Sequence, residues 1–405
     1  MNSLHSCPES LCKSRPLSEG EDSIATKRFV VLDGWRGLCA LLVAIHNVDF
    51  GPWIPQRSFV AHSSLFVDFF FVLSGFVISH AYAGKLRRLS DATAFMLRRF
   101  GRLWPLHVTV LVSLVIMHFA RFAIAGVAHL DLDADVPNAV LSARTILTNL
   151  LFIQIFDVRS RLSWNAPSWS ISTEFWTYLT FAVVCLLFLT RRMSVLVVGA
   201  IAVFAAGVIF FQSADFLETN TAFAFFRCLY GFSVGHLTYQ AFRSVPAKSG
   251  SILELSVVLL VVSYVTFTGN EVTSMIAPAI FGFSIWVFAQ EHGIVSWSMK
   301  TRLFVGLGTW SYSIYMVHWI LRNLLVRVNE IIEKLIARHS IPSYFSMTQA
   351  RTQLIVIAVY LIVTVVMAAL AYRWIEQPGR RYFNRWAGKL FPSVLEKKDM
   401  CGSAS

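Results

Sequence analysis

Long apolar segments, separated by short polar stretches, recur along nearly the whole chain. A helix of about 20 apolar residues crosses the hydrocarbon core of a bilayer, and most of these segments approach that length. The pattern therefore predicts an all-α polytopic membrane bundle of about ten transmembrane helices. We expect them near residues 32–50, 65–83, 106–125, 168–189, 195–211, 222–239, 252–267, 273–288, 303–325 and 353–375.

Composition supports this class of protein. Hydrophobic residues make up 56% of the chain and charged residues only 14%, which excludes an ordinary soluble globular domain. The net charge of +12 is consistent with Lys and Arg in cytoplasmic loops and does not by itself indicate nucleic acid as a partner. The six cysteines are scattered without a paired spacing, so we expect neither a disulfide framework nor a metal site.

The charged residues between the segments predict the orientation. With the N-terminus inside, most Lys and Arg fall on the inner connections, while the acidic run Asp131, Asp133 and Asp135 falls outside. This bias predicts that both termini are cytoplasmic. The expected organisation is a disordered cytoplasmic tail over 1–28, a transmembrane domain over 29–385 and a cytoplasmic C-terminal tail over 386–405.

The first apolar segment contains polar residues in unusual positions. Asp33 and Arg36 lie at its start, and His46 follows ten residues after Arg36, about 15 Å along a helix. An ionisable ring near the bilayer centre is costly and usually faces a cavity or a partner. His46 is therefore either a packing residue hydrogen-bonded to a neighbouring helix or part of a functional site.

A group of arginines precedes the third segment. Arg98 and Arg102 are four residues apart and share a helix face, with Arg99 beside them, and Pro105 is suited to open the following helix. Such a group at the inner membrane surface is suited to lipid head groups. It is equally suited to a phosphate-bearing donor, because the guanidinium fork matches phosphate oxygens.

The fourth segment opens with Trp169, Ser170, Glu174 and Trp176. Ser170 and Glu174 are four residues apart and therefore lie on one helix face. A carboxylate one turn inside a membrane segment is rarely present for stability alone. The group indicates either an interfacial carboxylate with membrane-belt tryptophans or a carbohydrate site in which sugar rings stack on tryptophan.

Two further segments carry polar residues. Asp68 and Ser74 interrupt the aromatic second segment, where Ser74 is equally explained by close helix packing. In the ninth segment Ser311, Tyr315 and His318 form a polar stripe and place a second histidine deep in the bilayer. Together with Glu174 and the arginines, these positions predict a polar cavity through the bundle.

These residues together resemble the acyltransferase-3 family, integral membrane proteins that O-acylate bacterial cell-surface carbohydrates and some secreted glycolipids. The matching motifs follow the family's order: Leu32-Asp33-Gly34-Trp35-Arg36-Gly37 with His46, Phe71-Val72-Leu73-Ser74-Gly75-Phe76, Arg98-Arg99-x-x-Arg102-Leu-x-Pro105, Trp169-Ser170-x-Ser172-x-Glu174, Gly308-x-x-Ser311-Tyr312-Ser313-x-Tyr315-x-x-His318 and Tyr372-Arg373-x-x-Glu376-x-Pro378.

The resemblance implies a cytoplasmic acyl-CoA donor, acetyl-CoA in the first instance, and a carbohydrate or glycolipid acceptor that enters from the other face. It assigns a role to each position. The catalytic residues would be His46, as general base, and Glu174; coenzyme A would be held by Arg36, Arg98, Arg99 and Arg102; and the pore or substrate path would be lined by Asp33, Ser74, Trp169, Ser170, Tyr315 and His318.

The chain departs from the family in one place. One residue fewer separates Arg36 from His46 than in the usual pattern, so that Asn47 takes the histidine position by strict count. A tightened helical turn at Gly37 would restore the alignment. We expect His46 to keep the role.

Other functions share some of these features. A proton-coupled transporter also uses intramembrane His, Glu and Arg, although no internal repeat is evident. A glycosyltransferase using a polyprenyl-phosphate sugar would hold phosphate with arginines, and a noncatalytic scaffold is the remaining alternative. The expected location is the bacterial inner membrane, with acyl-CoA, acceptor and membrane lipid as partners and no nucleic acid; the oligomeric state is left open.

Overall fold

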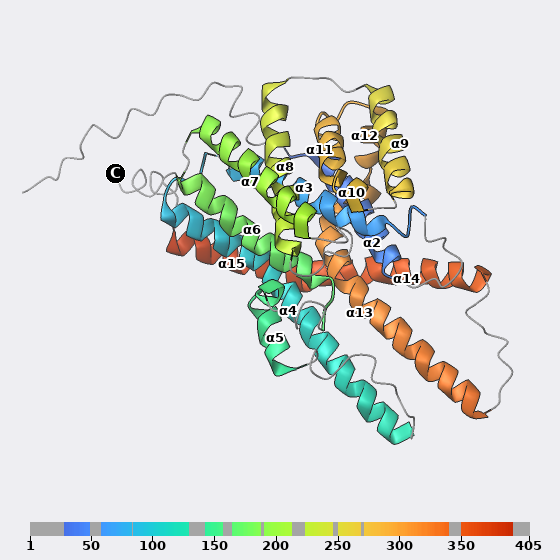
Figure 1. Cartoon of the computed structure of the whole chain (residues 1–405). Helices are drawn as coiled ribbons and strands as arrows, with labels where there is room; N and C mark the ends of the chain where they lie inside the picture. Colours follow the sequence, from blue (N-terminus) through green and yellow to red (C-terminus); the bar gives the residue numbers. More distant parts are fainter. Residues whose placement is uncertain are drawn as a thin grey trace, which may run out of the picture.

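The computed structural model describes residues 28–48, 58–82, 84–128, 142–156, 164–187, 190–212, 223–245, 250–268, 271–339 and 350–391, and throughout these ranges the regular structure is helical (Figure 1). The elements are α2 (Val30–His46), η3 (Ser63–Leu65), α3 (Phe66–Tyr82), α4 (Leu89–Ala128), α5 (Ala143–Leu150), η4 (Gln154–Phe156), α6 (Ser168–Leu187), α7 (Arg191–Gln212), α8 (Ala224–Ser244), α9 (Ser251–Phe267), α10 (Glu271–Ser274), α11 (Ala277–Phe288), α12 (Ile294–Met299), α13 (Arg302–His339), α14 (Ala350–Ala371), η5 (Tyr372–Glu376) and α15 (Gln377–Leu390).

Five segments of this part of the chain are long and apolar enough to cross a membrane: Ser63–Tyr82, Leu89–Arg121, Ser168–Leu187, Arg191–Phe211 and Leu354–Leu390. Two shorter apolar helices, Ser251–Phe267 and Ala277–Phe288, accompany them. The structure therefore confirms an all-helical fold in the described ranges, with five candidate membrane-spanning helices. The total of about ten spans and the cytoplasmic placement of the termini stay predictions. The acidic run Asp131, Asp133 and Asp135 and the N-terminal tail up to residue 27 lie outside the described residues.

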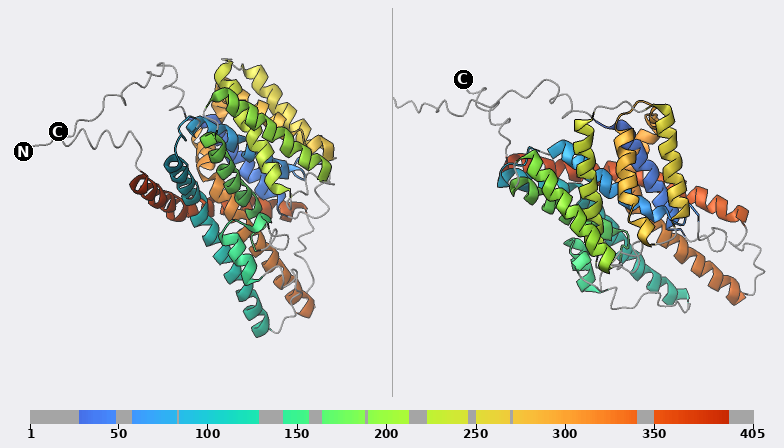
Figure 2. Two further views of the ribbon diagram at one scale, coloured as in Figure 1. Left: turned by 60° about the vertical axis from the view of Figure 1, so that its left-hand side comes forward. Right: turned by 45° about the horizontal axis from the view of Figure 1, so that its top comes forward.

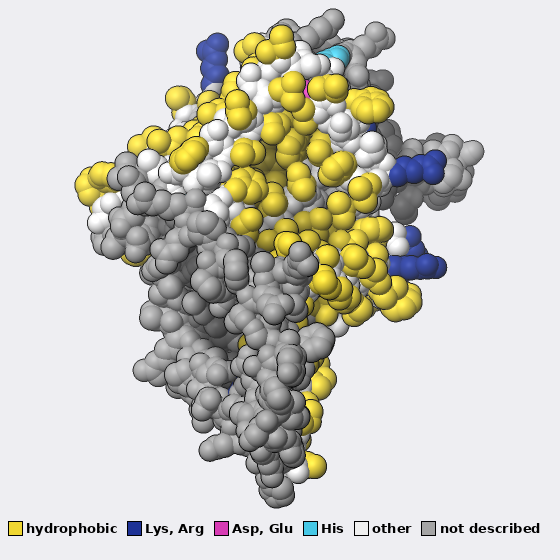
Figure 3. Space-filling model, turned by 90° about the vertical axis from the view of Figure 1, so that its right-hand side faces the viewer, with side chains coloured by type: hydrophobic (Ala, Val, Ile, Leu, Met, Phe, Trp, Pro, Cys, Tyr) yellow, Lys and Arg dark blue, Asp and Glu magenta, His cyan; other side chains and the backbone are white. Residues whose placement is uncertain are grey.

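The bundle presents a broad hydrophobic surface (Figure 3). On α9, Ile252 and Phe267 are more than four-fifths exposed, at 82% and 83%. On α14, Leu354 and Ile362 are exposed by 67% and 64%. Apolar side chains exposed in such numbers on neighbouring helices are typical of a surface that faces lipid.

The chain departs from the predicted segments in three places. Pro105 does not open a helix, because α4 continues through it without interruption. The arginines and the third apolar segment therefore belong to the same helix. The ninth segment likewise continues to His339, where a loop was expected. The last segment passes through a π-helical turn, η5, directly into α15. The long ends of α4 and α13 extend beyond the rest of the bundle in the same direction (Figures 1 and 2).

Packing explains the continuity at Pro105. A proline inside a helix removes one hydrogen bond and clashes with the residue four positions earlier. Here that residue is Gly101, and α15 packs on this turn of α4. A Cβ at Gly379 would lie 2.5 Å from Pro105 Cγ, so only glycine permits the approach. Neighbouring helices commonly stabilise prolines in membrane helices in this way.

Glycine contacts also fix the two central helix pairs. Between α3 and α8, a Cβ on Gly75 would lie 2.0 Å from Phe232 O. Between α2 and α13, a Cβ on Gly37 would lie 2.5 Å from Leu307 C, and one on Gly308 would lie 2.1 Å from Asp33 O. Small residues that let backbones meet are the usual means by which membrane helices associate.

Gly37 therefore serves packing. The tightened turn expected there is absent, because α2 is an ordinary α-helix from Val30 to His46.

We predict that Gly37→Ala destabilises the bundle by about 1–3 kcal/mol, because the new methyl group forces α2 away from α13. Gly199 in α7 is the matched control, since a Cβ there has no neighbour within 4 Å. Thermal unfolding of the detergent-purified variants tests the prediction. Equal melting temperatures for Gly37→Ala and Gly199→Ala would contradict it.

Candidate active site

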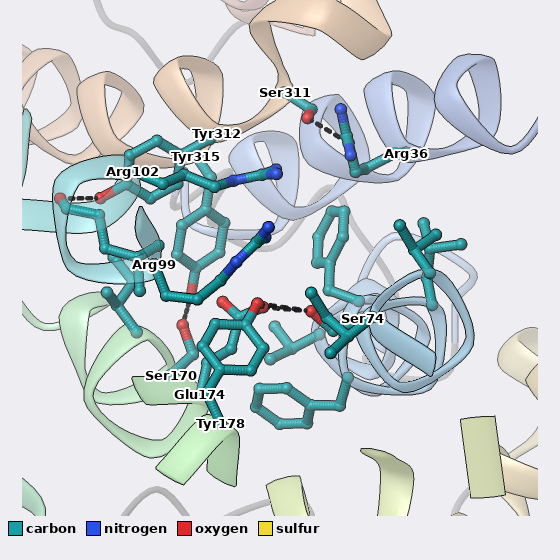
Figure 4. Close-up of a pocket in the computed structure, with 18 residues that line it drawn as sticks. Arg36, Ser74, Arg99, Arg102, Ser170, Glu174, Tyr178, Ser311, Tyr312 and Tyr315 are labelled. Atoms are coloured by element: carbon teal, nitrogen blue, oxygen red, sulfur yellow. Dashed lines mark hydrogen bonds between the residues drawn. The ribbon is translucent and has the colours of Figure 1, made fainter. Parts of the chain in front are cut away.

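Many of the predicted polar residues line a cavity of about 100 Å³ between α2, α3, α4, α6 and α13 (Figure 4). We call it the arginine cavity. Its polar lining comprises Arg36, Ser74, Arg99, Arg102, Ser170, Glu174, Tyr178, Ser311, Tyr312 and Tyr315. Residues from five separate helices therefore meet at one place.

Glu174 is held on one side of this cavity by two hydroxyl groups. Ser74 Oγ, from α3, and Tyr178 OH, one turn further along α6, both donate to Glu174 Oε1. The two hydroxyl oxygens are themselves 2.9 Å apart. Two hydrogen bonds from hydroxyl groups therefore fix the orientation of the carboxyl group.

The arginines of the cavity differ in their hydrogen-bond and ion-pair partners. Arg36 donates to Ser311 Oγ at 2.7 Å and to Gly308 O at 2.8 Å. It also lies 3.4 Å from Asp33, which places Asp33 behind Arg36 as its support. Asp33 does not itself line the cavity.

Arg99 and Arg102 reach into the space between Glu174 and Arg36 (Figure 4). Arg99 lies over the rings of Tyr82 and Tyr178, at 5.3 and 5.9 Å, and its Nη2 donates to Tyr82 OH at 3.3 Å. Arg99 Nε is buried and finds no acceptor among the described residues. Neither arginine forms an ion pair in the part of the chain that the structure describes. Half-buried guanidinium groups that no carboxylate contacts at ion-pair distance are suited to bind an anion.

Arg98 lies elsewhere. It is half-buried and does not line the cavity, so the residues that share the cavity face are Arg99 and Arg102, three apart, and not Arg98 and Arg102.

His46 occupies a second cavity, of about 120 Å³, which we call the histidine cavity. It is lined by Val43, His46, Asn47, Ser64, Val67, Ala166, Pro167, Trp169, Arg227 and Tyr315. His46 and Glu174, the two predicted catalytic residues, therefore lie in different cavities.

The environment of the histidine defines its tautomer. His46 Nδ1 lies 3.2 Å from Val60 O, and because a carbonyl only accepts, Nδ1 carries the proton. No described residue hydrogen-bonds Nε2, whose lone pair is left for a ligand in the cavity. Asn47 also lines this cavity, but its Nδ2 donates to Val43 O of its own helix at 2.9 Å. Of the two adjacent residues, His46 has the chemistry of a base.

Tyr315 and Val67 line both cavities. Tyr315 OH is 2.8 Å from Ser170 Oγ and donates to Pro167 O at 3.0 Å. This hydrogen-bonded tyrosine therefore separates the two cavities, and Ser170 lies beside it on the arginine side.

Of the remaining predicted residues, one lines the histidine cavity and two line neither cavity. Trp169 lines the histidine cavity and carries Arg227 over its ring at 5.6 Å. His318 is fully buried with its ring centroid 5.7 Å from that of Tyr315, and neither ring nitrogen has a partner among the described residues. His318 lines neither cavity. Trp176 donates to Phe152 O and is likewise absent from both linings.

Sequence reasoning missed one buried ion pair. Arg227 of α8 binds Asp68 of α3 in two parallel hydrogen bonds of 2.9 and 2.8 Å, and both side chains are buried. The signal was present, because Arg227 interrupts an apolar segment as Asp68 does. Its pairing across the bundle neutralises both charges beside the histidine cavity.

Comparisons with known proteins show the family to which the chain belongs. A family model described as an acyltransferase domain matches residues 29–373, and the chain belongs to this acyltransferase-3 family. The chain is similar to "Acyltransferase MdmB" of Streptomyces mycarofaciens, with 25% identity over 72% of this chain and 78% of that protein. It is also similar to "Protein 2 in picA locus" of Rhizobium radiobacter, with 36% identity over 36% of this chain and 78% of that protein. No solved structure matches the chain.

We predict that Asp68→Asn destabilises the protein by about 3–5 kcal/mol, because it leaves the Arg227 charge buried without its partner. The double variant Asp68→Leu/Arg227→Met removes both charges and should recover most of that loss. Thermal unfolding of the purified variants measures both effects. A single variant as stable as the wild type would contradict the assignment.

Proposed function

We propose that this membrane acyltransferase moves an acyl group, acetyl in the first instance, from cytoplasmic acyl-CoA to a hydroxyl of a cell-surface or secreted carbohydrate or glycolipid in the bacterial inner membrane. The observation that carries the proposal is the pair of cavities that meet at Tyr315. One offers the guanidinium groups of Arg99 and Arg102, and the other offers a histidine whose Nε2 carries a lone pair. A donor and an acceptor that approach from opposite faces would meet between them.

The arginine cavity fits the anionic donor. Coenzyme A carries phosphate groups, and a guanidinium binds phosphate through paired hydrogen bonds. Arg99 and Arg102 supply donors that no carboxylate of the described chain satisfies by an ion pair. Arg36, bound to Ser311 and Gly308 O, would hold the opposite wall.

The histidine cavity fits the acceptor. His46 Nε2 would take the proton of the acceptor hydroxyl as its oxygen bonds to the acyl carbon. The carbon–sulfur bond of the thioester then breaks, and the coenzyme A thiolate leaves and recovers the proton from the imidazolium. Trp169, in the same cavity, is suited to pack against a sugar ring.

Glu174 would act from the donor side. Its carboxylate, fixed by Ser74 and Tyr178, faces the guanidinium groups of Arg99 and Arg102 (Figure 4). A fixed negative charge there would offset the two cations when no donor is bound and help to orient the donor on arrival. Ser170 and Tyr315 would form the boundary that the acyl group reaches.

We predict that His46→Ala lowers acyl transfer by about 10²–10⁴-fold, the usual contribution of a general base. Asn47→Ala is the matched control and should retain activity, because the Asn47 side chain is bonded to its own helix. Transfer of label from acetyl-CoA to endogenous glycan in membrane vesicles measures both. Loss of transfer in Asn47→Ala alone would move the base role away from His46.

We predict that Arg102→Gln raises the KM for acyl-CoA roughly tenfold to a hundredfold, since it removes charge-assisted hydrogen bonds worth about 1.5–3 kcal/mol. Arg98→Gln should leave KM nearly unchanged, because Arg98 lies off the cavity.

Equal effects of the Arg98 and Arg102 variants on KM would show that these arginines act only through their overall positive charge and not through direct contact with acyl-CoA. A wild-type protein that neither binds coenzyme A nor transfers label, but moves protons with a solute, would favour the transporter alternative.

A further inference from the structure

A third cavity, of about 370 Å³, lies apart from the two described above. We call it the basic cavity and define it by Arg87, Arg191, Arg243, Ser194, His236 and Gln240. It is larger than the arginine cavity and the histidine cavity, and it shares no lining residue with either. Its volume is within the range of small-molecule sites, roughly 300–1,000 Å³.

The lining of the basic cavity has one sign of charge. Its arginines come from three elements: the segment after α3, the first turn of α7 and the last turn of α8. No Asp or Glu of the described chain lines it. Three guanidinium groups that line one space give it a positive potential, which attracts an anion.

One of these arginines is held by a buried polar chain. Arg191 Nε donates to Gln240 Oε1 at 2.8 Å, and Arg191 Nη2 donates to Gln240 O at 3.1 Å and to Ser244 Oγ at 2.7 Å. Gln240 Nε2 in turn lies 3.4 Å from His236 Nε2, and His236 Nδ1 lies 2.8 Å from Ser79 Oγ. His236 and Ser79 are fully buried. A chain of hydrogen bonds therefore runs from the buried His236 to the exposed Arg191 and orients its guanidinium group at the cavity wall.

An aromatic wall separates the basic cavity from the arginine cavity. The Phe181 ring lies 6.3 Å from His236 on one side and 6.2 Å from Phe95 on the other. Phe95 in turn lies 6.0 Å from Tyr178, which lines the arginine cavity. A ligand of the basic cavity would thus not touch the acyl-transfer residues.

We propose that the basic cavity is a binding site for a phosphate group, carried by an anionic membrane lipid or by a soluble phosphate compound. Guanidinium groups from several elements match the oxygens of one phosphate, and basic pockets between membrane helices on the cytoplasmic side bind lipid head groups. Met193 and Leu196 on the adjoining turn of α7 are exposed by 49% and 73%, which gives a lipid chain an apolar surface beside the head-group site.

The test measures binding of labelled phosphatidylglycerol and, separately, of labelled inorganic phosphate to the detergent-purified full chain. We expect Arg191→Gln and Arg243→Gln each to weaken binding about tenfold, the effect of one lost charge-assisted hydrogen bond. Arg192→Gln is the matched control, since this neighbouring arginine is exposed and lies outside the cavity lining. Melting temperature without ligand checks folding, and Arg87→Gln, at an exposed position, replaces any variant that unfolds.

Binding of the lipid alone supports a head-group site open to the membrane, and competition by inorganic phosphate supports a site for the phosphate itself. Absence of both, or an equal loss in Arg192→Gln, overturns the proposal. Acyl-transfer activity is not the readout, so the result is independent of the proposed reaction.

Discussion

The site depends on the close contact between α2 and α13. Gly37 and Gly308 let the two backbones meet, and in that register Arg36 bonds to Gly308 O and Ser311. The same register places His46, near the other end of α2, in a cavity that Tyr315 of α13 also lines. A shift of one residue would turn His46 by about 100° around its helix. One packing contact therefore positions groups in both cavities.

The charged side chains inside the bundle fall into two groups: those with partners among the described residues and those that face a cavity. Asp68 and Arg227 neutralise each other, and Glu254 accepts hydrogen bonds from the backbone of Gly293 and Ser296 at the start of α12. These groups are satisfied and stabilise helix contacts. Arg99 and Arg102 instead face a cavity without an ion pair in the described chain. Guanidinium groups that face a cavity without a carboxylate at ion-pair distance are suited to bind an anionic ligand.

Tyr315 forms the boundary between the arginine cavity and the histidine cavity. Its hydroxyl bonds to Ser170 and to Pro167 O, and its side chain lines both spaces. Such a boundary suits a reaction whose donor and acceptor come from different faces, because water and either substrate are kept from a continuous path.

The amino-acid sequence was sufficient to predict an all-helical fold and to identify many of the polar residues that line the two cavities. Long apolar segments require helices in lipid, and a polar residue such as His46 or Glu174 stands out wherever apolar ones are expected. Which polar groups meet is visible only in the folded chain. Arg99 and Arg102 line the arginine cavity, whereas Arg98 does not. His46 and Glu174 lie in different cavities, and Arg227 pairs with Asp68. The folded chain also shows that α4 continues through Pro105. These outcomes depend on the rotation and register of each helix against its neighbours. Side-chain packing between segments distant in sequence determines that rotation and register, and local sequence does not.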